Sequence, residues 1–440
     1  MLDINNKCKE FASITLEVLD SIIDRCDKDP AYPFLDTKIN IITGENIYPP
    51  APDKPYNAKD IIFSWIQGRG LEALAGHARW LQTSPNDESF RIEKIRGIMV
   101  TLVEKMEDIR SKNNGRMYFI MNTAGEFLEV AEDGSLVKAD QVRAGANYSD
   151  LFYSKGLMAA AEFLNKPDLL ADAEKYFERV LDDIRSGRFA SDQQSFDPKN
   201  KVAFVEGKML QGPWMISLDG IALAAQFCNK EKWLGIAREV ITYIFQNHIN
   251  TGQISQLQKY DFWEAIDVDG QPWKENGQLF CDPGHALEFV GLSMKCVLQM
   301  LDDRNMDTVK FIEYCKLHIP EVLRHCFELG FAAGPGGIIK AFDLVDRKAI
   351  NTDMPWWSLP ETIRAAAEVY KLTGDDYAVE VFQKCADAFL NNYINKEVYS
   401  MAYQTRDSQG NPVEVVPATP DADPGYHTGL SLIDAIRCAE

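Results

Sequence analysis

The heptapeptide Asp-Pro-Gly-His-Ala-Leu-Glu at residues 282–288 has the composition of a helix start. Asp282 is a preferred N-cap residue, and Pro283 suits the first helical position, where a missing N–H costs nothing. His285 is then in the first turn, with Glu288 three residues further on the same face. The positive end of the helix dipole favours a neutral imidazole, so we expect His285 to accept a proton near pH 7.

A second helix start of the same kind occurs near the end of the chain. Residues 423–427 read Asp-Pro-Gly-Tyr-His and place His427 just after another Asp-Pro-Gly. A lone histidine on a helix is usually structural, and we expect this of the four histidines that lack such a setting, which are His77, His248, His318 and His325. His285 and His427 are therefore the candidate acid–base pair.

Helical periodicity recurs along the whole chain and predicts twelve helices. The connections between them alternate in length: short ones follow the even-numbered helices and long ones follow the odd-numbered helices. Six helical hairpins joined by long loops are typical of an all-α (α/α)6 barrel, whose long loops all lie at one end. The predicted helices lie near residues 7–26, 58–82, 90–112, 148–165, 168–187, 210–228, 231–248, 283–301, 306–328, 355–373, 376–394 and 424–438.

Several long loops contain short runs of alternating apolar residues, for example 117–121, 259–263 and 338–342. Such runs predict short strands or hairpins at the rim of the barrel. No linker or low-complexity segment divides the chain, so we expect a single catalytic domain over residues 1–440.

Each even-numbered helix carries aromatic or polar residues near its start, and these would meet at one mouth if the even helices form the inner ring. Tryptophan beside polar groups suits a sugar, because the ring stacks on apolar faces while polar groups bind hydroxyls. A buried arginine such as Arg69 requires an oxygen-rich partner. Asp150, Asp219 and Glu361 could equally be helix caps or ion-pair partners. The candidate substrate-binding residues are Arg69, Glu288, Trp65, Gln67, Tyr148, Asp150, Trp214, Asp219, Trp357 and Glu361.

Composition and motifs exclude several classes of function. A net charge of −20 argues against nucleic acid and anionic membrane surfaces as partners. No stretch is apolar enough to span a bilayer, and the first 20 residues do not form a signal peptide. Nine cysteines without a pairing pattern indicate a reduced, cytoplasmic protein. The sequence has no phosphate-loop, dinucleotide or His-Glu-x-x-His motif, so we expect no cofactor and no metal.

Five short elements together resemble the N-acylglucosamine 2-epimerase family, which includes cellobiose 2-epimerases and aldose–ketose isomerases. They are Trp-Ile-Gln-Gly-Arg at 65–69, Tyr-Ser-Asp-Leu-Phe at 148–152, Pro-Gly-His-Ala-Leu-Glu at 283–288, Trp-Trp at 356–357 with Glu361, and Tyr-His at 426–427. The Pro-Gly-His-x-x-Glu element is the most specific of the five. The matches occur in family order and cover most of the chain.

The resemblance implies an (α/α)6 barrel in which His285 and His427 are the general acid and base. It also implies that Arg69 binds a substrate oxygen and that Glu288 supports His285 or the substrate. The implied reaction moves a proton at C2 of a free reducing sugar through an enediolate, as in the interconversion of N-acylglucosamine and N-acylmannosamine. The implied assembly is a homodimer.

Two alternatives stay open at this point. A glycoside hydrolase on the same barrel, for example one acting on unsaturated uronides, would use carboxylates such as Asp150 and Asp219. A non-catalytic sugar-binding relative would keep the cavity but not the chemistry. Two departures from the family pattern bear on this choice: Leu359 and Leu430 stand where the family usually has a histidine and an arginine.

Overall fold

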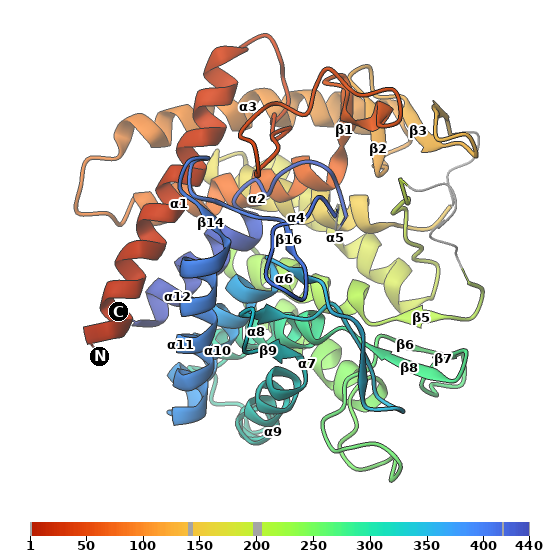
Figure 1. Ribbon diagram of the computed structural model, residues 1–440. Coiled ribbons are helices and arrows are strands. Elements are labelled where there is room, and N and C mark those ends of the chain that lie inside the picture. The colour runs from red at the N-terminus through yellow and green to blue at the C-terminus, as the bar shows by residue number, and fades with distance from the viewer. Residues whose placement is uncertain (1, 140–143, 197–204, 416–417, 440) are drawn as a thin grey trace.

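The computed structural model describes residues 2–139, 144–196, 205–415 and 418–439. Within these residues twelve α-helices follow one another along the chain (Figure 1). Their bounds are α1 Leu2–Lys28, α2 Ser64–Leu81, α3 Ser89–Lys112, α4 Tyr148–Phe163, α5 Pro167–Arg185, α6 Gly212–Phe227, α7 Lys230–Asn247, α8 Pro283–Gln299, α9 Met306–Gly330, α10 Ser358–Thr373, α11 Asp376–Ala388 and α12 Ser431–Ala439.

The even-numbered helices form the inner ring of an (α/α)6 barrel, as the loop pattern predicts. Each packs against the next, from α2 through α4, α6, α8 and α10 to α12. A π-helical turn, Tyr426–Leu430, precedes α12 and closes the ring by contacting α2. Helix α1 lies beside α12, so the two ends of the chain meet on one side of the molecule (Figure 1).

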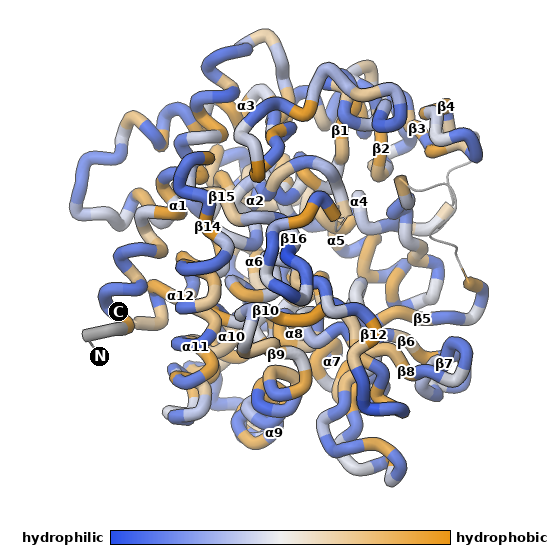
Figure 2. The backbone as a smooth tube through the Cα atoms, viewed as in Figure 1, coloured by the Kyte–Doolittle hydropathy of each residue, from blue (hydrophilic) through white to orange (hydrophobic). Residues whose placement is uncertain are grey.

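The sequences of the helices explain their places in the two rings. Helix α6 contains one charged residue, Asp219, and is buried almost throughout, as expected of a helix that is apolar all round. Helix α5 instead has a charged face and a buried face, the latter formed by residues such as Tyr176 and Val180. Figure 2 shows this amphipathic pattern as alternating hydrophilic and hydrophobic segments along outer helices such as α3 and α9. Among the described helices, none is long and apolar enough to cross a membrane.

Short antiparallel strands occupy the long connections and fix the starts of the inner helices. The two larger sheets have the strand orders β1-β2-β3-β4 and β12-β11-β8-β7, with Ile62 opposite Met121 and Phe342 opposite Cys281. Strands β1, β5, β8 and β13 each end a few residues before α2, α6, α8 and α10 begin. The strands are β1 Ile61–Phe63, β2 Ile120–Asn122, β3 Phe127–Val130, β4 Leu136–Lys138, β5 Met209–Leu210, β6 Ala265–Ile266, β7 Lys274–Glu275, β8 Gln278–Cys281, β9 Phe331–Ala332, β10 Gly337–Ile338, β11 Ala341–Asp343, β12 Lys348–Asn351, β13 Met354–Pro355, β14 Ile394–Asn395, β15 Met401–Ala402 and β16 Thr405–Arg406.

Some predicted boundaries are wrong for identifiable reasons. The helix predicted from residue 58 begins at Ser64, because residues 61–63 pair with β2 instead. The strand predicted at 259–263 does not form: Tyr260 has a φ of 71°, which breaks an extended chain, and only Phe262 makes an isolated bridge, to Ile249.

Two glycines allow α2 and α4 of the inner ring to approach closely. A Cβ on Gly156 of α4 would lie 2.2 Å from the carbonyl oxygen of Gly68 in α2, and a Cβ on Gly68 would lie 2.8 Å from the backbone of Phe152. Only glycine permits this contact without displacing a backbone. The approach places Arg69, the next residue of α2, over the ring of Phe152.

We therefore predict that Gly156→Ala lowers the free energy of unfolding by roughly 1–3 kcal/mol through overpacking. The matched control is Gly235→Ala in α7, where an added Cβ meets no atom within 4 Å. The control should instead stabilise the helix by up to about 1 kcal/mol, because alanine has the higher helix propensity. Urea unfolding measures both values, and equal stabilities for the two variants would contradict the packing role of Gly156.

Candidate active site

His285 stands in the first turn of α8, as predicted. The Asp282 carboxylate caps the helix by accepting hydrogen bonds from the backbone N–H groups of Gly284 (3.0 Å) and His285 (3.4 Å). Pro283 is the first helical residue. A Cβ on Gly284 would lie 2.9 Å from the indole of Trp357, so glycine here lets that ring pack against the helix start.

The electrostatic environment of His285 differs from our expectation of a neutral imidazole. Its Nδ1 lies 3.0 Å from Glu264 Oε2 and 3.5 Å from Asp282 Oδ2. Burial alone would lower the pKa of His285, but the charges of Asp282 and Glu264 outweigh it and raise that pKa to about 9. The expectation is wrong because a helix terminus supplies about half a unit charge, whereas two full carboxylate charges stand beside the ring.

His427 is held in a different way, inside the π-helical turn. The predicted helix start at residue 424 is displaced, because Gly425 has a φ of 80° and the turn begins at Tyr426. Asp423 caps it by accepting hydrogen bonds from the N–H groups of Tyr426 (2.9 Å) and Thr428 (3.0 Å). Beneath the turn, the imidazole of His77 lies 3.2 Å from the carbonyl oxygen of Gly425.

A carboxylate from the neighbouring helix orients the His427 ring. His427 Nδ1 lies 2.8 Å from Glu361 Oε1, near the start of α10. Glu361 also accepts hydrogen bonds from Arg364 and from the hydroxyl of Ser431. Burial opposes ionisation of Glu361, but Arg364 and His427 hold its pKa below the ordinary value, so the carboxylate stays charged. Of the two functions considered for Glu361, the geometry favours the ion-pair partner.

The two histidines meet at Trp357. The indole centroid lies 5.3 Å from the His285 ring and 5.8 Å from the His427 ring. Glu288 lies beside them, with a carboxylate oxygen within 4.8 Å of ligand atoms of both Glu361 and His427. Burial and the charge of Glu361 raise the pKa of Glu288 above its ordinary value.

Glu288, Glu361 and His427 are also the described residues whose spacing could suit a metal ion. The charge of Glu361 is already balanced by Arg364, and its other oxygen accepts from His427 and Ser431. We therefore interpret Glu361 as the ion-pair and hydrogen-bond partner of Arg364 and His427 rather than as a metal ligand.

Arg69 lies in an aromatic cage rather than against a carboxylate. Its guanidinium carbon is 4.1 Å from the ring centroid of Phe152, 5.6 Å from that of Trp65 and 5.5 Å from that of Tyr426. Among the described residues, none forms a hydrogen bond or ion pair with this guanidinium. Tyr148 extends the same wall, with its ring centroid 5.4 Å from that of Trp65. The positive charge is thus available to an oxygen of a ligand.

Four predicted substrate contacts have other functions in the structure. Gln67 binds the backbone of Leu35 through both ends of its amide. Asp150 accepts from the N–H of Met117 and from Arg116, and completes the N-terminal capping box of α4.

The other two predicted contacts are engaged by residues other than the histidines. Trp214 stacks on Tyr243 of outer helix α7, with centroids 4.2 Å apart. Asp219 is buried below the site, between Lys155 and Lys295. Sequence reasoning assigned these four residues by their nearness to a helix start, but the side of the helix on which they lie decides their contacts.

The sequence analysis missed two residues of the site, Glu264 and Lys340. Glu264 binds His285, and Lys340 binds Asp282 Oδ2 at 2.5 Å. Both come from long connections, where no local pattern marks a residue that binds a histidine or its helix cap, so sequence reasoning could not identify them.

A family model described as N-acylglucosamine 2-epimerase (GlcNAc 2-epimerase) matches residues 122–428. No sequence among the curated proteins matches the chain. Three solved structures share its fold. They are a cellobiose 2-epimerase from Bacillus thermoamylovorans B4167 (TM-score 0.71, 12% identity, covering 98% of this chain and 99% of that one), a cellobiose 2-epimerase from Spirochaeta thermophila DSM 6192 (0.68, 13%, 100% and 98%) and a D-mannose isomerase (0.63, 16%, 95% and 97%).

The charge on His285 leads to a prediction that needs no substrate. In an NMR titration of the histidine side chains, we expect His285 to remain protonated through pH 7 and to titrate near pH 9. Glu264→Gln should lower this pKa by removing one negative partner. His248 is an internal control, because burial lowers its pKa to about 4. A titration of His285 at or below 6.5 in the unsubstituted protein would contradict this reading.

The same shift has a consequence for stability. Because the pKa is raised on folding, protonated His285 contributes stability in full below about pH 6.5 and loses it as the pH rises through 9. The stability difference between the protein and its Glu264→Gln variant should therefore shrink over that interval in urea unfolding.

Proposed function

The chain belongs to the N-acylglucosamine 2-epimerase family, and we propose that it epimerises or isomerises a free reducing sugar by moving a proton at C2. One observation carries the proposal. Two histidines, each held at Nδ1 by a carboxylate, flank a single tryptophan at one end of the barrel, in a site where an arginine has no acidic partner among the described residues. We further propose that the whole chain acts as one catalytic domain.

The first step requires an open-chain sugar whose C1 carbonyl acidifies the C2 proton. One histidine removes that proton through Nε2, since Nδ1 is occupied by its carboxylate. The electron pair of the C–H bond becomes the C1–C2 double bond, and negative charge develops on O1. Arg69 stabilises this oxygen, because a guanidinium fixed between aromatic rings in a water-poor site does not have to reorganise.

The second step returns a proton. Delivery to the opposite face of C2 gives the epimer, whereas delivery to C1, with transfer of the O2 proton to O1, gives the ketose. The raised pKa of His285 makes it the proton donor in the resting enzyme, which leaves His427 as the base for that direction of reaction. In the reverse reaction, His285 is the base and His427 is the proton donor, because the proton leaves one face of C2 and returns to the other.

The surrounding groups suit a sugar. Trp357 and the cage of Trp65 and Phe152 offer rings for stacking on C–H faces, and the Glu288 carboxyl group offers a polar contact to a hydroxyl. All of these groups come from one chain, so the proposed chemistry does not need the implied homodimer. We propose an N-acyl hexosamine or a related reducing sugar as substrate, in line with the family resemblance.

The departures from the family pattern lie in different places. Leu359 is fully buried at the start of α10, close to Trp357 in sequence. Leu430 instead packs against Gly76 of α2 and lines a cavity at the opposite end of the barrel.

The rival glycoside hydrolase needs two available carboxyl groups. The two acids considered for it are engaged elsewhere: Asp150 caps α4, and Asp219 is bound by two lysines below the site. The geometry therefore favours proton transfer by the histidines over glycosidic cleavage.

The direct test is hydrogen exchange at C2. Incubation with N-acetylglucosamine, N-acetylmannosamine, mannose and cellobiose in heavy water should introduce deuterium at C2 of the accepted sugar, which proton NMR detects. We expect His285→Ala and His427→Ala each to reduce the exchange rate by about 10²–10⁴-fold.

The matched control is His318→Ala, which removes a histidine of outer helix α9 that contacts Tyr260. It should leave the exchange rate unchanged. Full activity in both His285→Ala and His427→Ala would overturn the assignment of the acid–base pair, and release of a glycosidic fragment without C2 exchange would support the hydrolase.

A further inference from the structure

We propose that Lys155 is a positioning residue of the proposed epimerase site, whose buried ammonium fixes the phenol of Tyr426 and thereby orients His427 and Arg69. The inference rests on the proposed function for its effect on catalysis. Its structural part is independent of the substrate. Nothing in the sequence motifs points to Lys155, which lies in the middle of α4 between two family-like elements.

The first observation is the complete burial of the ammonium and its contact with three polar groups. The Lys155 side chain has 0% exposure, and an ammonium group has three protons to donate. Lys155 donates hydrogen bonds to Tyr426 Oη and Asp219 Oδ2, and it forms an ion pair with Glu72 Oε2 at 2.8 Å. These come from the π-helical turn, α6 and α2, so one atom ties three inner-ring segments to α4.

The second observation is the position of the Tyr426 ring. Its hydroxyl accepts a hydrogen bond from Lys155 and donates one to Asp219 Oδ2 (3.1 Å). Its ring meets His427 edge-on with centroids 4.8 Å apart, and it forms one side of the cage around Arg69. A tyrosine held at its hydroxyl cannot tilt, and so it fixes the ring of the proposed base and the guanidinium together.

The charges of this layer are consistent with a fixed phenol. Burial would raise the pKa of Asp219, but Lys155 and Lys295 hold it well below its ordinary value, so Asp219 stays an acceptor. Burial, together with Asp219 and Glu72, raises the pKa of Tyr426 well above its ordinary value, so the phenol stays a donor. Burial and Asp219 raise the pKa of Glu72 to about 8.

The alternative interpretation is that the ionic layer only joins the inner helices. Buried ion pairs can be replaced by apolar residues at little cost in stability, so burial alone does not imply a catalytic function. The chain offers a lysine that separates the two interpretations. Lys295 of α8 binds the other oxygen of the same carboxylate, Asp219 Oδ1, at 2.7 Å, but among its described contacts it does not reach Tyr426.

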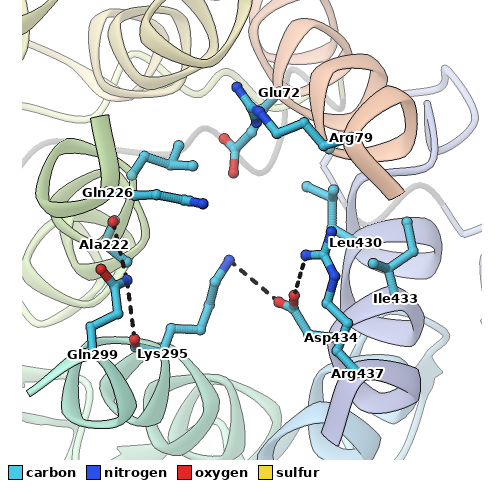
Figure 3. A pocket seen from close by; sticks show the side chains of 12 residues that line it. Glu72, Arg79, Ala222, Gln226, Lys295, Gln299, Leu430, Ile433, Asp434 and Arg437 are labelled. Carbon is cyan, nitrogen blue, oxygen red and sulfur yellow. Dashed lines mark hydrogen bonds and ion pairs between the residues drawn. The ribbon is translucent and has the colours of Figure 1, made fainter. Parts of the chain in front are cut away.

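Lys295 lies on the far side of the layer from the histidines. It points into a cavity of about 100 Å³ at the C-terminal ends of the inner helices, toward which Glu72, Gln226 and Asp434 also point (Figure 3). There it forms an ion pair with Asp434 at 3.4 Å. Lys155 and Lys295 therefore share one carboxylate, while Lys155 alone of the two contacts a residue of the site.

The experiment compares Lys155→Met with Lys295→Met in C2 exchange, and uses thermal unfolding to confirm that both variants fold. We expect Lys155→Met to lower kcat by roughly 10- to 100-fold with little change in KM, because a misplaced base slows the chemical step more than binding. Lys295→Met should change kcat by no more than about twofold. This change is much smaller than the roughly 10- to 100-fold loss expected for a misplaced site group. Equal losses in both variants would show a purely structural layer and overturn the proposal.

Tyr426→Phe provides a second variant that keeps Lys155 and removes only the hydroxyl. Tyr426→Phe should reproduce the loss in kcat. The double variant, Lys155→Met with Tyr426→Phe, should lose no more kcat than the more damaging of the two single variants. Additive losses would mean that Lys155 acts by another route and would overturn the inference. This arm also decides the question if Lys155→Met fails to fold.

A substrate-free measurement separates this inference from the proposed function. The His427 ring and Arg69 Nε–H resonances should shift in Lys155→Met and stay in place in Lys295→Met. If the unsubstituted protein shows no C2 exchange, the proposed function fails, and these resonances still decide whether Lys155 positions the two side chains. Unchanged resonances in Lys155→Met would overturn the inference even in an active enzyme.

Discussion

The parallel alignment of the inner helices is the constraint on which the rest of the structure depends. All their N-termini lie at the end that carries the long loops, so unpaired backbone N–H groups and positive dipole ends collect there. The carboxylates of Asp282 and Asp423 accept hydrogen bonds from these N–H groups as helix caps, and a histidine follows each cap within a few residues. At the opposite end, the last turns of α2 and α12 carry Arg79 and Arg437, as negative dipole ends favour.

The dipoles do not by themselves determine the chemistry of the site. The Nδ1 atom of each histidine contacts a carboxylate from another segment. Glu264, from a loop, contacts His285, and Glu361, from α10, contacts His427. Arg69 lacks such a partner among the described residues and is held by aromatic rings. The barrel thus places two histidine–carboxylate pairs beside Trp357 and a cation without an acidic partner, among the described residues, between Trp65, Phe152 and Tyr426.

The sequence allowed the fold and part of the site to be predicted because the signals for them are local. Helical periodicity, alternating loop lengths and the Asp282 cap each depend on residues close together in the chain. The neutral state expected for His285 was wrong because Glu264 is not visible to local reasoning. Gln67, Asp150, Trp214 and Asp219 were placed at the correct end of the correct helices, but their contacts depend on neighbours from distant segments. Lys155 and Lys340 could not have been found at all without those neighbours.

The closure of the ring also determines when the site can exist. The contact between His77 and Gly425 joins residues 348 positions apart and supports the turn that carries His427. Contacts so distant in sequence form late in folding, because a long loop must close before they contribute stability. A partly folded chain that has already formed its first hairpins therefore contains Arg69 but does not yet have His427 in place. Under the proposed function, proton transfer requires the last hairpin, so activity would report completed folding rather than helix content.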